Sequence, residues 1–322
     1  SGDAGYTYSS EEVGVRTDEG YGFNHDITFS GSGELDNGFT VSTTMILVEG
    51  ATLSSSNVAL TMGGMGTITI GGGLGNVGGG FDAVTPFAYE ENHDGMATTT
   101  AIDSMGSLSD GNSILYAAPA LEVGGATVNI TAGYTPEAGD SVTGEGAVSA
   151  QSANFGSAKT LGVKVGVAGL TAGIFGEEVD GDTDDGSVSG ASRRGDAMSA
   201  TWFANYSFGP VSVGYQKAGL DHGINAAATD ATTAKTIAAA GGFFESELMS
   251  IAFNVNENLS ISYGELTETY NAQDNASSAI ANVDMESDSI QFAYTMGSMS
   301  IKGYQTETSN PGWDSNADSN TE

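Results

Sequence analysis

The stretch that decides the fold is Met198-Ser199-Ala200-Thr201-Trp202-Phe203-Ala204-Asn205-Tyr206-Ser207-Phe208. Apolar side chains occupy every second position of it, and mostly polar side chains lie between them. Successive side chains of a β-strand point to opposite faces of a sheet. The stretch is therefore predicted to be one long strand with an apolar face and a polar face.

The same alternation recurs along the whole chain and predicts an all-β protein. The 322 residues could form two ordinary domains, but a large β-barrel also reaches this length as one unit, so we predict a single domain over residues 1–322. About fifteen strands are visible. They lie near residues 3–9, 23–33, 38–48, 57–63, 65–72, 113–118, 125–135, 158–167, 169–177, 197–208, 210–218, 244–255, 257–267, 285–296 and 298–308.

The composition excludes several classes of function. With 41 acidic and 8 basic residues the formal net charge is −33, which repels phosphate backbones and argues against nucleic-acid binding. The chain has no cysteine, which rules out disulfides, thiolate metal sites and a cysteine nucleophile. No apolar run reaches the length of about 18 residues that a membrane-spanning helix requires.

The connections between the predicted strands alternate in length. Short turns such as Gly209-Pro210 and Gly297-Ser298 alternate with long links near 10–22, 49–56, 73–112, 136–157, 178–196, 219–243 and 268–284. Short turns at one end and long loops at the other are typical of outer-membrane barrels. No Asp, Glu, Lys or Arg occupies the apolar positions in the middle of the predicted strands, although a soluble sandwich would also keep charge from its core face.

These patterns predict a transmembrane antiparallel up-and-down β-barrel. Such a barrel needs an even number of strands, so we expect sixteen. The last visible strand is followed by a polar tail from Asn310 to Glu322, where an apolar descending strand is expected. We therefore expect the given sequence to stop short of the natural C-terminus.

Several short segments carry a resemblance to a known family. They are Ser1-Gly2-Asp3-Ala4, then Ser32-Gly33-Glu34-Leu35-Asp36-Asn37-Gly38-Phe39, then Met65-Gly66-Thr67-Ile68-Thr69-Ile70-Gly71. In order and spacing the chain resembles the alphaproteobacterial, Rhodobacter-type general diffusion porins, most clearly over its first 120 residues. The resemblance implies a sixteen-stranded homotrimeric barrel in the bacterial outer membrane, in contact with lipid and lipopolysaccharide. It also implies passive diffusion of small hydrophilic solutes and a third long loop, here about 73–112, folded into the pore.

Charged residues of this third loop are the candidate selectivity residues. Carboxylates lining a pore attract cations and repel anions, whereas the alternative is an acidic loop that is simply solvated. The family usually places basic residues on the opposite wall, but here the lumen positions carry only Lys164 and Lys302, and Arg16 could reach the mouth. We therefore expect the transverse electric field across the constriction to be weak or one-sided. The acidic candidates are Asp82, Glu90, Glu91, Asp94 and Asp103.

Other motifs give weaker signals. Acidic residues from Glu177 to Asp185 crowd one long loop, and Asp180, Asp182 and Asp184 resemble the start of a calcium-binding loop. The glycine and the closing glutamate of that motif are absent from their required positions, so solvated acids are the competing interpretation to bound Ca²⁺. The three histidines lie in distant segments, and no nucleophile or oxyanion device accompanies them. We predict no catalytic residues, no enzyme activity and no cofactor.

The resulting hypothesis is a cation-preferring outer-membrane porin for small hydrophilic solutes and ions. Two alternatives stay open. An acidic secreted β-rich adhesin or surface protein would need no bilayer. A substrate-specific outer-membrane channel would need aromatic ladders or basic clusters in the lumen.

Overall fold

A computed structural model describes most of the chain. The described residues are 2–13, 16–48, 52–72, 77–92, 100–109, 111–136, 138, 155–181, 195–223, 243–271, 284–297, 299–313 and 320–321. Among these residues the regular structure is almost entirely β, and its few 3-10 turns are each three residues long. No helix in this part of the chain is long and apolar enough to cross a membrane.

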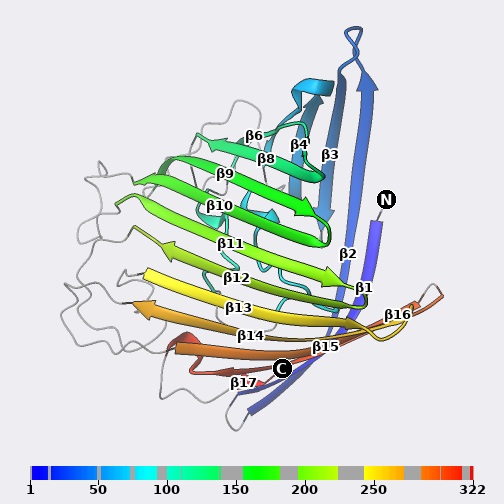
Figure 1. Cartoon of the computed structure of the whole chain (residues 1–322), viewed down its shortest axis with the longest axis vertical. Coiled ribbons are helices and arrows are strands. Elements are labelled where there is room, and N and C mark those ends of the chain that lie inside the picture. The colour runs from blue at the N-terminus through cyan, green and yellow to red at the C-terminus, as the bar shows by residue number, and fades with distance from the viewer. Residues whose placement is uncertain are drawn as a thin grey trace.

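The strands form one antiparallel sheet of seventeen members. Each strand of the main series pairs with its neighbour in the chain, which is the up-and-down order that the alternating turns predict (Figure 1). The strands are β1 (Gly2–Val13), β2 (Arg16–Glu34), β3 (Thr40–Val48), β4 (Thr52–Thr61), β5 (Thr67–Gly72), β6 (Ser113–Ala117), β7 (Leu121–Val123), β8 (Ala126–Thr135), β9 (Phe155–Val167), β10 (Leu170–Gly181), β11 (Ala197–Phe208), β12 (Val211–Asp221), β13 (Phe243–Asn254), β14 (Leu259–Asn271), β15 (Asp284–Met296), β16 (Met299–Ser309) and β17 (Asn320–Thr321).

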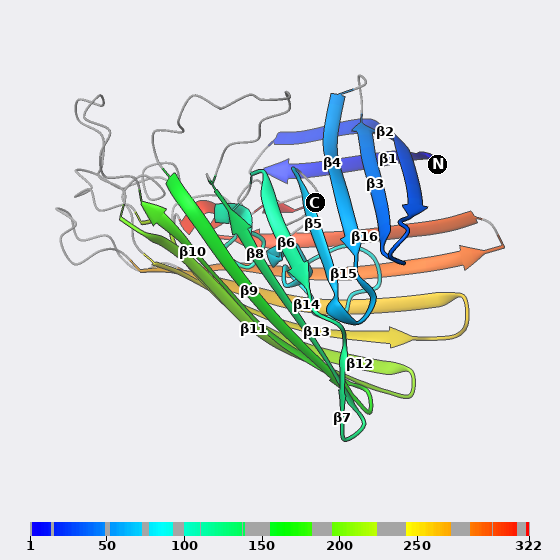
Figure 2. The same ribbon diagram turned by 90° about the horizontal axis from the view of Figure 1, so that it is seen from above.

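The pairings lead around the sheet and back to its first strand. From β2 they run without interruption to β16, with β7 as a short branch on β8. The short strand β17 then pairs with β16 through Thr321 and Glu307, and with β1 through Thr321 and Glu12. Because β1 also pairs with β2, the pairings form a closed circuit of strands, which Figure 2 shows from above.

All fifteen predicted strands are present, and the predicted all-β, antiparallel up-and-down architecture is confirmed. The place of the expected descending strand beside β16 is taken by the two-residue strand β17. Two of the predicted long links are wrong. The link near 10–22 is occupied by the ends of β1 and β2, which pair up to Val13 and Arg16. The link near 49–56 is shorter than predicted, because β3 extends to Val48 and β4 begins at Thr52. In both places the backbone pairing continues through polar residues. Strand ends predicted from side-chain polarity were therefore placed too early or too late.

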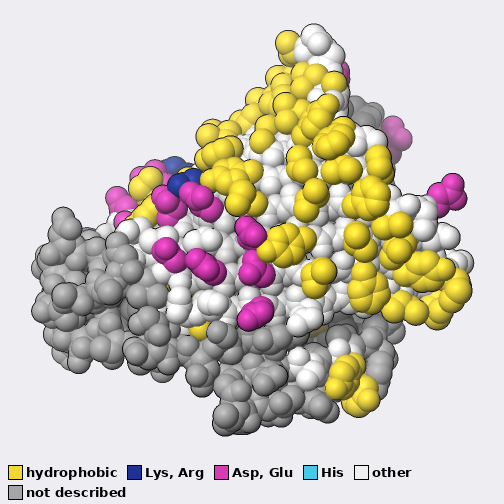
Figure 3. Space-filling view, turned by 60° about the horizontal axis from the view of Figure 1, so that its bottom comes forward, with side chains coloured by type: hydrophobic (Ala, Val, Ile, Leu, Met, Phe, Trp, Pro, Cys, Tyr) yellow, Lys and Arg dark blue, Asp and Glu magenta, His cyan; other side chains and the backbone are white. Residues whose placement is uncertain are grey.

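Large apolar side chains cover the outer face of the sheet. Ile174 is 61% exposed, Trp202 is 48% exposed and Ile290 is 60% exposed. In β11 this apolar face runs from Met198 to Phe208. Ten residue steps of a strand tilted by about 40° rise about 25 Å, the height of the lipid-facing band of membrane barrels. Figure 3 shows many apolar side chains spread over one side of this face, with other side chains and backbone between them.

The outer face is not free of charge, which corrects the sequence-based expectation. Glu265 lies at the midpoint of β14, exposed and directly opposite the exposed Asp288 of β15. Both strands extend further toward the long-loop end than predicted. The carboxylates therefore lie above the apolar belt, and Figure 3 shows acidic side chains along its margin. Lys217 of β12 lies directly across from Trp202, within the stretch from Met198 to Phe208, and its charge is paired with Glu245 and Glu247, each at 2.8 Å.

A charge placed in the belt tests its contact with lipid. Ile174→Lys is expected to destabilise the folded protein in bilayers, lowering its free energy of unfolding by about 2–4 kcal/mol, the cost of a lysine facing lipid near the midplane. Thr171→Lys, on the inward face of the same strand, is the matched control and should change it little. Urea titration of protein refolded into lipid vesicles measures both. Equal losses for the two variants would contradict a lipid-facing belt.

Candidate functional site

The described parts of the long segment between β5 and β6 pack against the inside of the sheet. We call residues 73–112 the inner loop, its described residues 77–92 the first arm, and 100–109 the second arm. Apolar side chains of both arms share one buried cluster with inward side chains of β10 to β14. The loop members are Val77, Phe81, Ala83, Ile102 and Met105, and the wall members are Phe175, Phe203, Ala218, Leu248 and Leu266.

Phe81 is the main apolar anchor of the first arm. Its side chain is 2% exposed, and its ring stacks on Phe175 with centroids 5.4 Å apart. A second ring, that of Phe203, meets it edge-on at 6.1 Å. Burying a phenylalanine contributes about 1.5–3 kcal/mol, so this one contact holds the start of the loop against β10 and β11.

Wall glycines make room for the first arm. A Cβ atom on Gly162 would lie 2.5 Å from Cε2 of Phe81, and one on Gly214 would lie 2.4 Å from Cδ of Pro86. A Cβ on Gly264 would lie 2.6 Å from the ring of Phe87. These three glycines come from β9, β12 and β14, so together they form a track on the inner wall along which the bulky loop side chains lie.

Neutral amide side chains hold the backbone of the first arm. Gln216 of β12 accepts a hydrogen bond from the Val84 N–H at 2.8 Å, and its amide nitrogen donates to the Phe81 carbonyl at 2.5 Å. Gln291 of β15 accepts from the Tyr89 and Glu90 N–H groups at 3.1 and 3.0 Å. A buried backbone N–H without a partner costs free energy, so these glutamines fix the arm in position.

Carboxylates hold the second arm instead. Glu177 of β10 is 3% exposed and accepts from the Gly106 N–H at 3.0 Å, the Ser109 N–H at 3.1 Å and the Ser199 hydroxyl at 2.5 Å. The sequence grouped Glu177 with the acids of a long loop, at the predicted end of a strand, whereas the side chain lies within β10 and faces inward. Its alternation with Phe175 and Val179 on the inward face of β10 was the available signal.

Glu268 of β14 repeats this arrangement. Its side chain is 0% exposed, and it accepts from the Ala101 N–H at 2.5 Å and from the Ser246 hydroxyl. Ser246 in turn accepts from the Ile102 N–H at 3.1 Å. Sequence analysis missed Glu268, Gln216 and Gln291, because a polar residue at an inward position predicts only contact with a polar lumen.

The acidic candidates lie on both arms. Asp82, Glu90 and Glu91 are half-buried on the first arm, and Asp103 is half-buried on the second. The structure brings Glu90 and Glu91 to the same wall residue, since the Glu91 carbonyl accepts from Gln291 at 3.3 Å. Asp94 lies outside the described residues.

The two lumen lysines both contact aromatic rings of the first arm. The Lys164 ammonium lies 4.7 Å from the centre of the Phe81 ring, and that of Lys302 lies 4.8 Å from the centre of the Tyr89 ring. These distances fit cation–π contacts. Arg16 belongs to β2, but its side chain lies outside the described part of the chain.

The proposed start of a calcium loop is only partly described. Asp180 lies in β10, where it accepts from the Ser157 hydroxyl at 2.6 Å and lies 3.9 Å from the Lys159 ammonium. Asp182 and Asp184 lie outside the described residues. In the part of the chain that the structure describes, no group of three His, Cys, Asp or Glu side chains could hold a metal ion.

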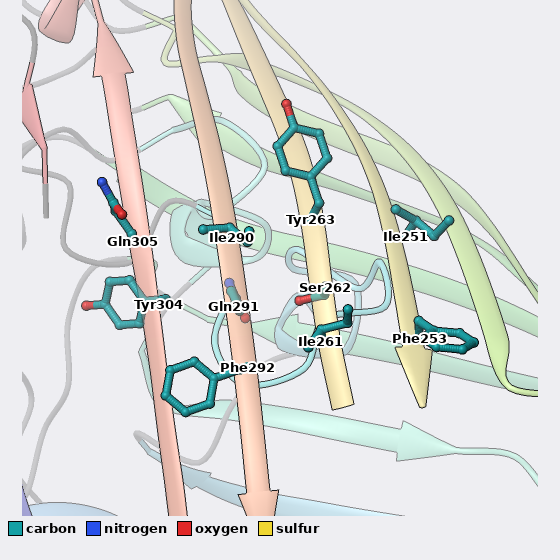
Figure 4. A pocket seen from close by; sticks show the side chains of 10 residues that line it. All are labelled: Ile251, Phe253, Ile261, Ser262, Tyr263, Ile290, Gln291, Phe292, Tyr304 and Gln305. Carbon is teal, nitrogen blue, oxygen red and sulfur yellow. The ribbon is translucent and has the colours of Figure 1, made fainter. Parts of the chain in front are cut away.

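A groove of about 630 Å³, lined mainly by apolar side chains, lies along β13 to β16. Figure 4 shows the outward side chains Ile251, Ile261, Ile290 and Phe292 around it. Ser262 and Gln291, which bind the first arm, also line the groove, so it borders the wall that holds the inner loop.

Comparison with known proteins finds similarity at the level of the fold. No protein-family model matches the sequence, and no curated protein matches it. A porin refined at 1.8 Å resolution is 16% identical, with a TM-score of 0.61 over 99% of this chain and 96% of its own. The anion-selective porin of Comamonas acidovorans is 11% identical, with a TM-score of 0.64 over 99% and 98%. A variant of the Rh. blastica porin is 14% identical, with a TM-score of 0.51 over 100% and 98%. The chain therefore has the fold of porins.

The glycine track gives a direct test of the loop position. Gly162→Val is expected to destabilise the protein by about 1–3 kcal/mol, because its side chain would overlap Phe81 and overpack the loop against the wall. Gly166→Val is the matched control on the inward face of the same strand, since a Cβ there meets nothing within 4 Å. Thermal unfolding in detergent, followed by circular dichroism, measures both. A Gly162→Val protein as stable as the control would contradict the packing.

Proposed function

We propose that this chain is a porin of the bacterial outer membrane, a passive diffusion channel for small hydrophilic solutes and ions. The observation that carries the proposal is the inner loop, which both arms fasten to the inside of a sheet whose outer face is apolar. A loop held inside a barrel narrows the passage for solutes, and passive diffusion through it requires no chemical step. Similarity to solved porins over nearly the whole chain supports the same function.

The proposed channel prefers cations. The chain carries 41 acidic against 8 basic residues, and acidic candidates lie on both arms of the inner loop. The lumen lysines contact aromatic rings of the loop, which already engage part of their charge. Since one similar structure is an anion-selective porin, the fold does not dictate the sign, and the side chains of this chain must supply it.

The membrane setting follows from the outer face. The belt from Met198 to Phe208 matches the lipid-facing band in height. The acidic margin that includes Glu265 and Asp288 would then lie at the level of the lipopolysaccharide head groups. An acidic secreted adhesin does not explain so extensive an exposed apolar surface, which a water-soluble monomer rarely has.

Membership of the Rhodobacter-type family and assembly as a homotrimer are part of the proposal. The segments from Ser32 to Phe39 and from Met65 to Gly71 support the family, together with the fold shared with the Rh. blastica porin. The trimer rests on that resemblance. A single barrel domain over 1–322 is supported by the one continuous sheet. Calcium bound near Asp180 stays a prediction.

A substrate-specific channel is the second candidate. It is favoured by one group in the lumen, where Tyr304 of β16 lies 6.3 Å from Tyr89 and Lys302 covers the same Tyr89 ring. Such a channel would show conductance that saturates with one class of solute and is blocked by it, whereas the diffusion channel would show conductance proportional to salt concentration.

Recording in planar lipid bilayers under a potassium chloride gradient tests the proposed function. We expect stable channels with a reversal potential that favours K⁺. Exchanging Asp103 for Asn should lower the ratio of K⁺ to Cl⁻ permeability up to about fourfold, because one charge about 10 Å from the ion contributes ~0.4 kcal/mol in water, attractive for K⁺ and repulsive for Cl⁻. Asp36→Asn, in the short turn between β2 and β3, is the control and should change it less. A reversal potential that favours Cl⁻ would contradict the cation preference, and a protein that stays soluble without detergent would contradict the channel.

A further inference from the structure

A cavity of about 340 Å³ lies on the inner side of the sheet, between the start of the inner loop and strands β5, β6, β8 and β9. Sites for small molecules have volumes of this order, and they are mostly apolar with a few polar groups. None of the described residues that line the cavity is acidic, although the chain carries 41 acidic residues. The charged group among them is the ammonium of Lys164.

The Lys164 ammonium keeps hydrogen-bond donors for a ligand. Its contacts in the described structure are with the rings of Phe81 and Phe203, whose centres lie 4.7 and 5.9 Å away. Within the described residues it forms no ion pair, whereas Lys159 and Lys217 both lie beside carboxylates. An aromatic face attracts the positive charge from one side, and an ammonium carries three N–H donors. An anion in the cavity can therefore accept from Lys164 while the contacts with the rings persist.

Asn129 places a second donor beside this ammonium. It lies on β8 directly across from Lys164 on β9, and both residues line the cavity. Side chains directly opposite each other on one face of a sheet have Cβ atoms about 4.5–5.5 Å apart. The Asn129 side chain is exposed and forms no hydrogen bond within the part of the chain that the structure describes. The ammonium and the amide together suit a carboxylate, whose two oxygens accept from such donors.

The opposite end of the cavity is apolar. Val77 of the loop and Leu115 of β6 meet above Gly133 of β8, since a Cβ atom there would lie 3.3 and 2.9 Å from their side chains. Gly133 is four residues along β8 from Asn129, which separates the two ends by about 13 Å at ~3.3 Å per residue. The ring of Phe81 also lines the cavity. The cavity therefore has a cationic end and an apolar end, separated by the length of a short carbon chain.

We propose that this cavity is a binding site for small monocarboxylates with an apolar tail, such as hexanoate or benzoate. The carboxylate accepts from Lys164 and Asn129, and the tail lies against Phe81, Val77 and Leu115. Binding itself rests on the cavity alone, whereas its consequence for permeation rests on the proposed function. A bound carboxylate neutralises the charge of one lumen lysine, so it would increase the cation preference of the channel.

The two ends together define the class of ligand. An inorganic anion would meet the donors of Lys164 and Asn129 but would leave the apolar end without a partner. A neutral apolar solute would fill that end and leave the donors unused. A dicarboxylate would place its second charge against Val77 and Leu115, where a charge without a partner is costly. A single carboxylate with an apolar tail satisfies both ends.

Binding of para-fluorobenzoate to the protein in lipid nanodiscs, followed by fluorine NMR, tests the proposal. Empty nanodiscs measure how much of the probe enters the lipid. We expect broadening of the probe signal that saturates with probe concentration. Hexanoate should displace the probe at a concentration at least about tenfold lower than acetate, because its chain fills the apolar end. No saturable binding beyond that of empty nanodiscs, or equal displacement by hexanoate, acetate and sulfate, would overturn the proposal.

Two variants test the cationic end. Lys164→Gln removes the ammonium, and Asn129→Asp places a carboxylate directly across from it, where it repels the ligand. Each should weaken binding of para-fluorobenzoate at least about fivefold, the effect of losing a charge-assisted hydrogen bond. Asn129 is exposed, so its exchange decides the question even where Lys164→Gln does not fold. Lys159→Gln, on the outer face of the same strand β9, is the matched control and should leave binding unchanged. Unchanged binding in the first two variants would overturn the assignment.

The site and the proposed function fail separately. In planar bilayers, hexanoate should raise the ratio of K⁺ to Cl⁻ permeability of the parent protein and should leave that of Lys164→Gln unchanged. An equal rise in both proteins would contradict the role of Lys164. Channels without saturable probe binding would refute the site alone, whereas a protein that binds the probe and forms no channels would refute the proposed function alone.

Discussion

The apolar outer face of the sheet is the constraint on which the rest of the structure depends. Large side chains such as Ile174, Trp202 and Ile290 point outward and are half or more exposed. In water such a surface would be strongly unfavourable, so it calls for an apolar surrounding. With the apolar faces turned outward, the inward faces are left to polar, small and anchoring residues. Apolar side chains therefore lie outside the barrel and polar ones inside, the reverse of the arrangement in a soluble barrel.

This inversion explains how a long loop can be held inside the barrel. Loop backbone in a buried place needs hydrogen-bond partners that it cannot supply itself. The wall supplies them with Glu177, Gln216, Glu268 and Gln291, and wall glycines leave the room that the loop side chains fill. Packing and hydrogen bonding therefore act together, and the width of the passage is set by residues of the barrel as much as by the loop.

The architecture could be predicted from the sequence because apolar and polar side chains alternate with a period of two in the long strands. Met198 to Phe208 alone identifies both faces of β11, whereas the inner loop at 73–112 was implied by the resemblance to porins, with which the length of the link agrees. Strand ends were harder, since β1 and β2 pair through polar residues whose side chains give no signal. The role of the wall carboxylates in holding the inner loop could not be predicted. Glu177 and Glu268 bind loop residues about 70 and 170 positions away, and only the register of the folded sheet brings them together.

Accessibility of spin labels along β11 tests the central claim most directly. Single cysteines at positions 200, 202 and 204 and at 201, 203 and 205, in protein reconstituted in bilayers, would be probed with oxygen, which concentrates in lipid, and with a water-soluble nickel complex. The account predicts high oxygen accessibility at the even positions and low oxygen accessibility at the odd positions, with period two. Even positions that respond to the nickel complex and not to oxygen would show that this face meets water, and would contradict the account.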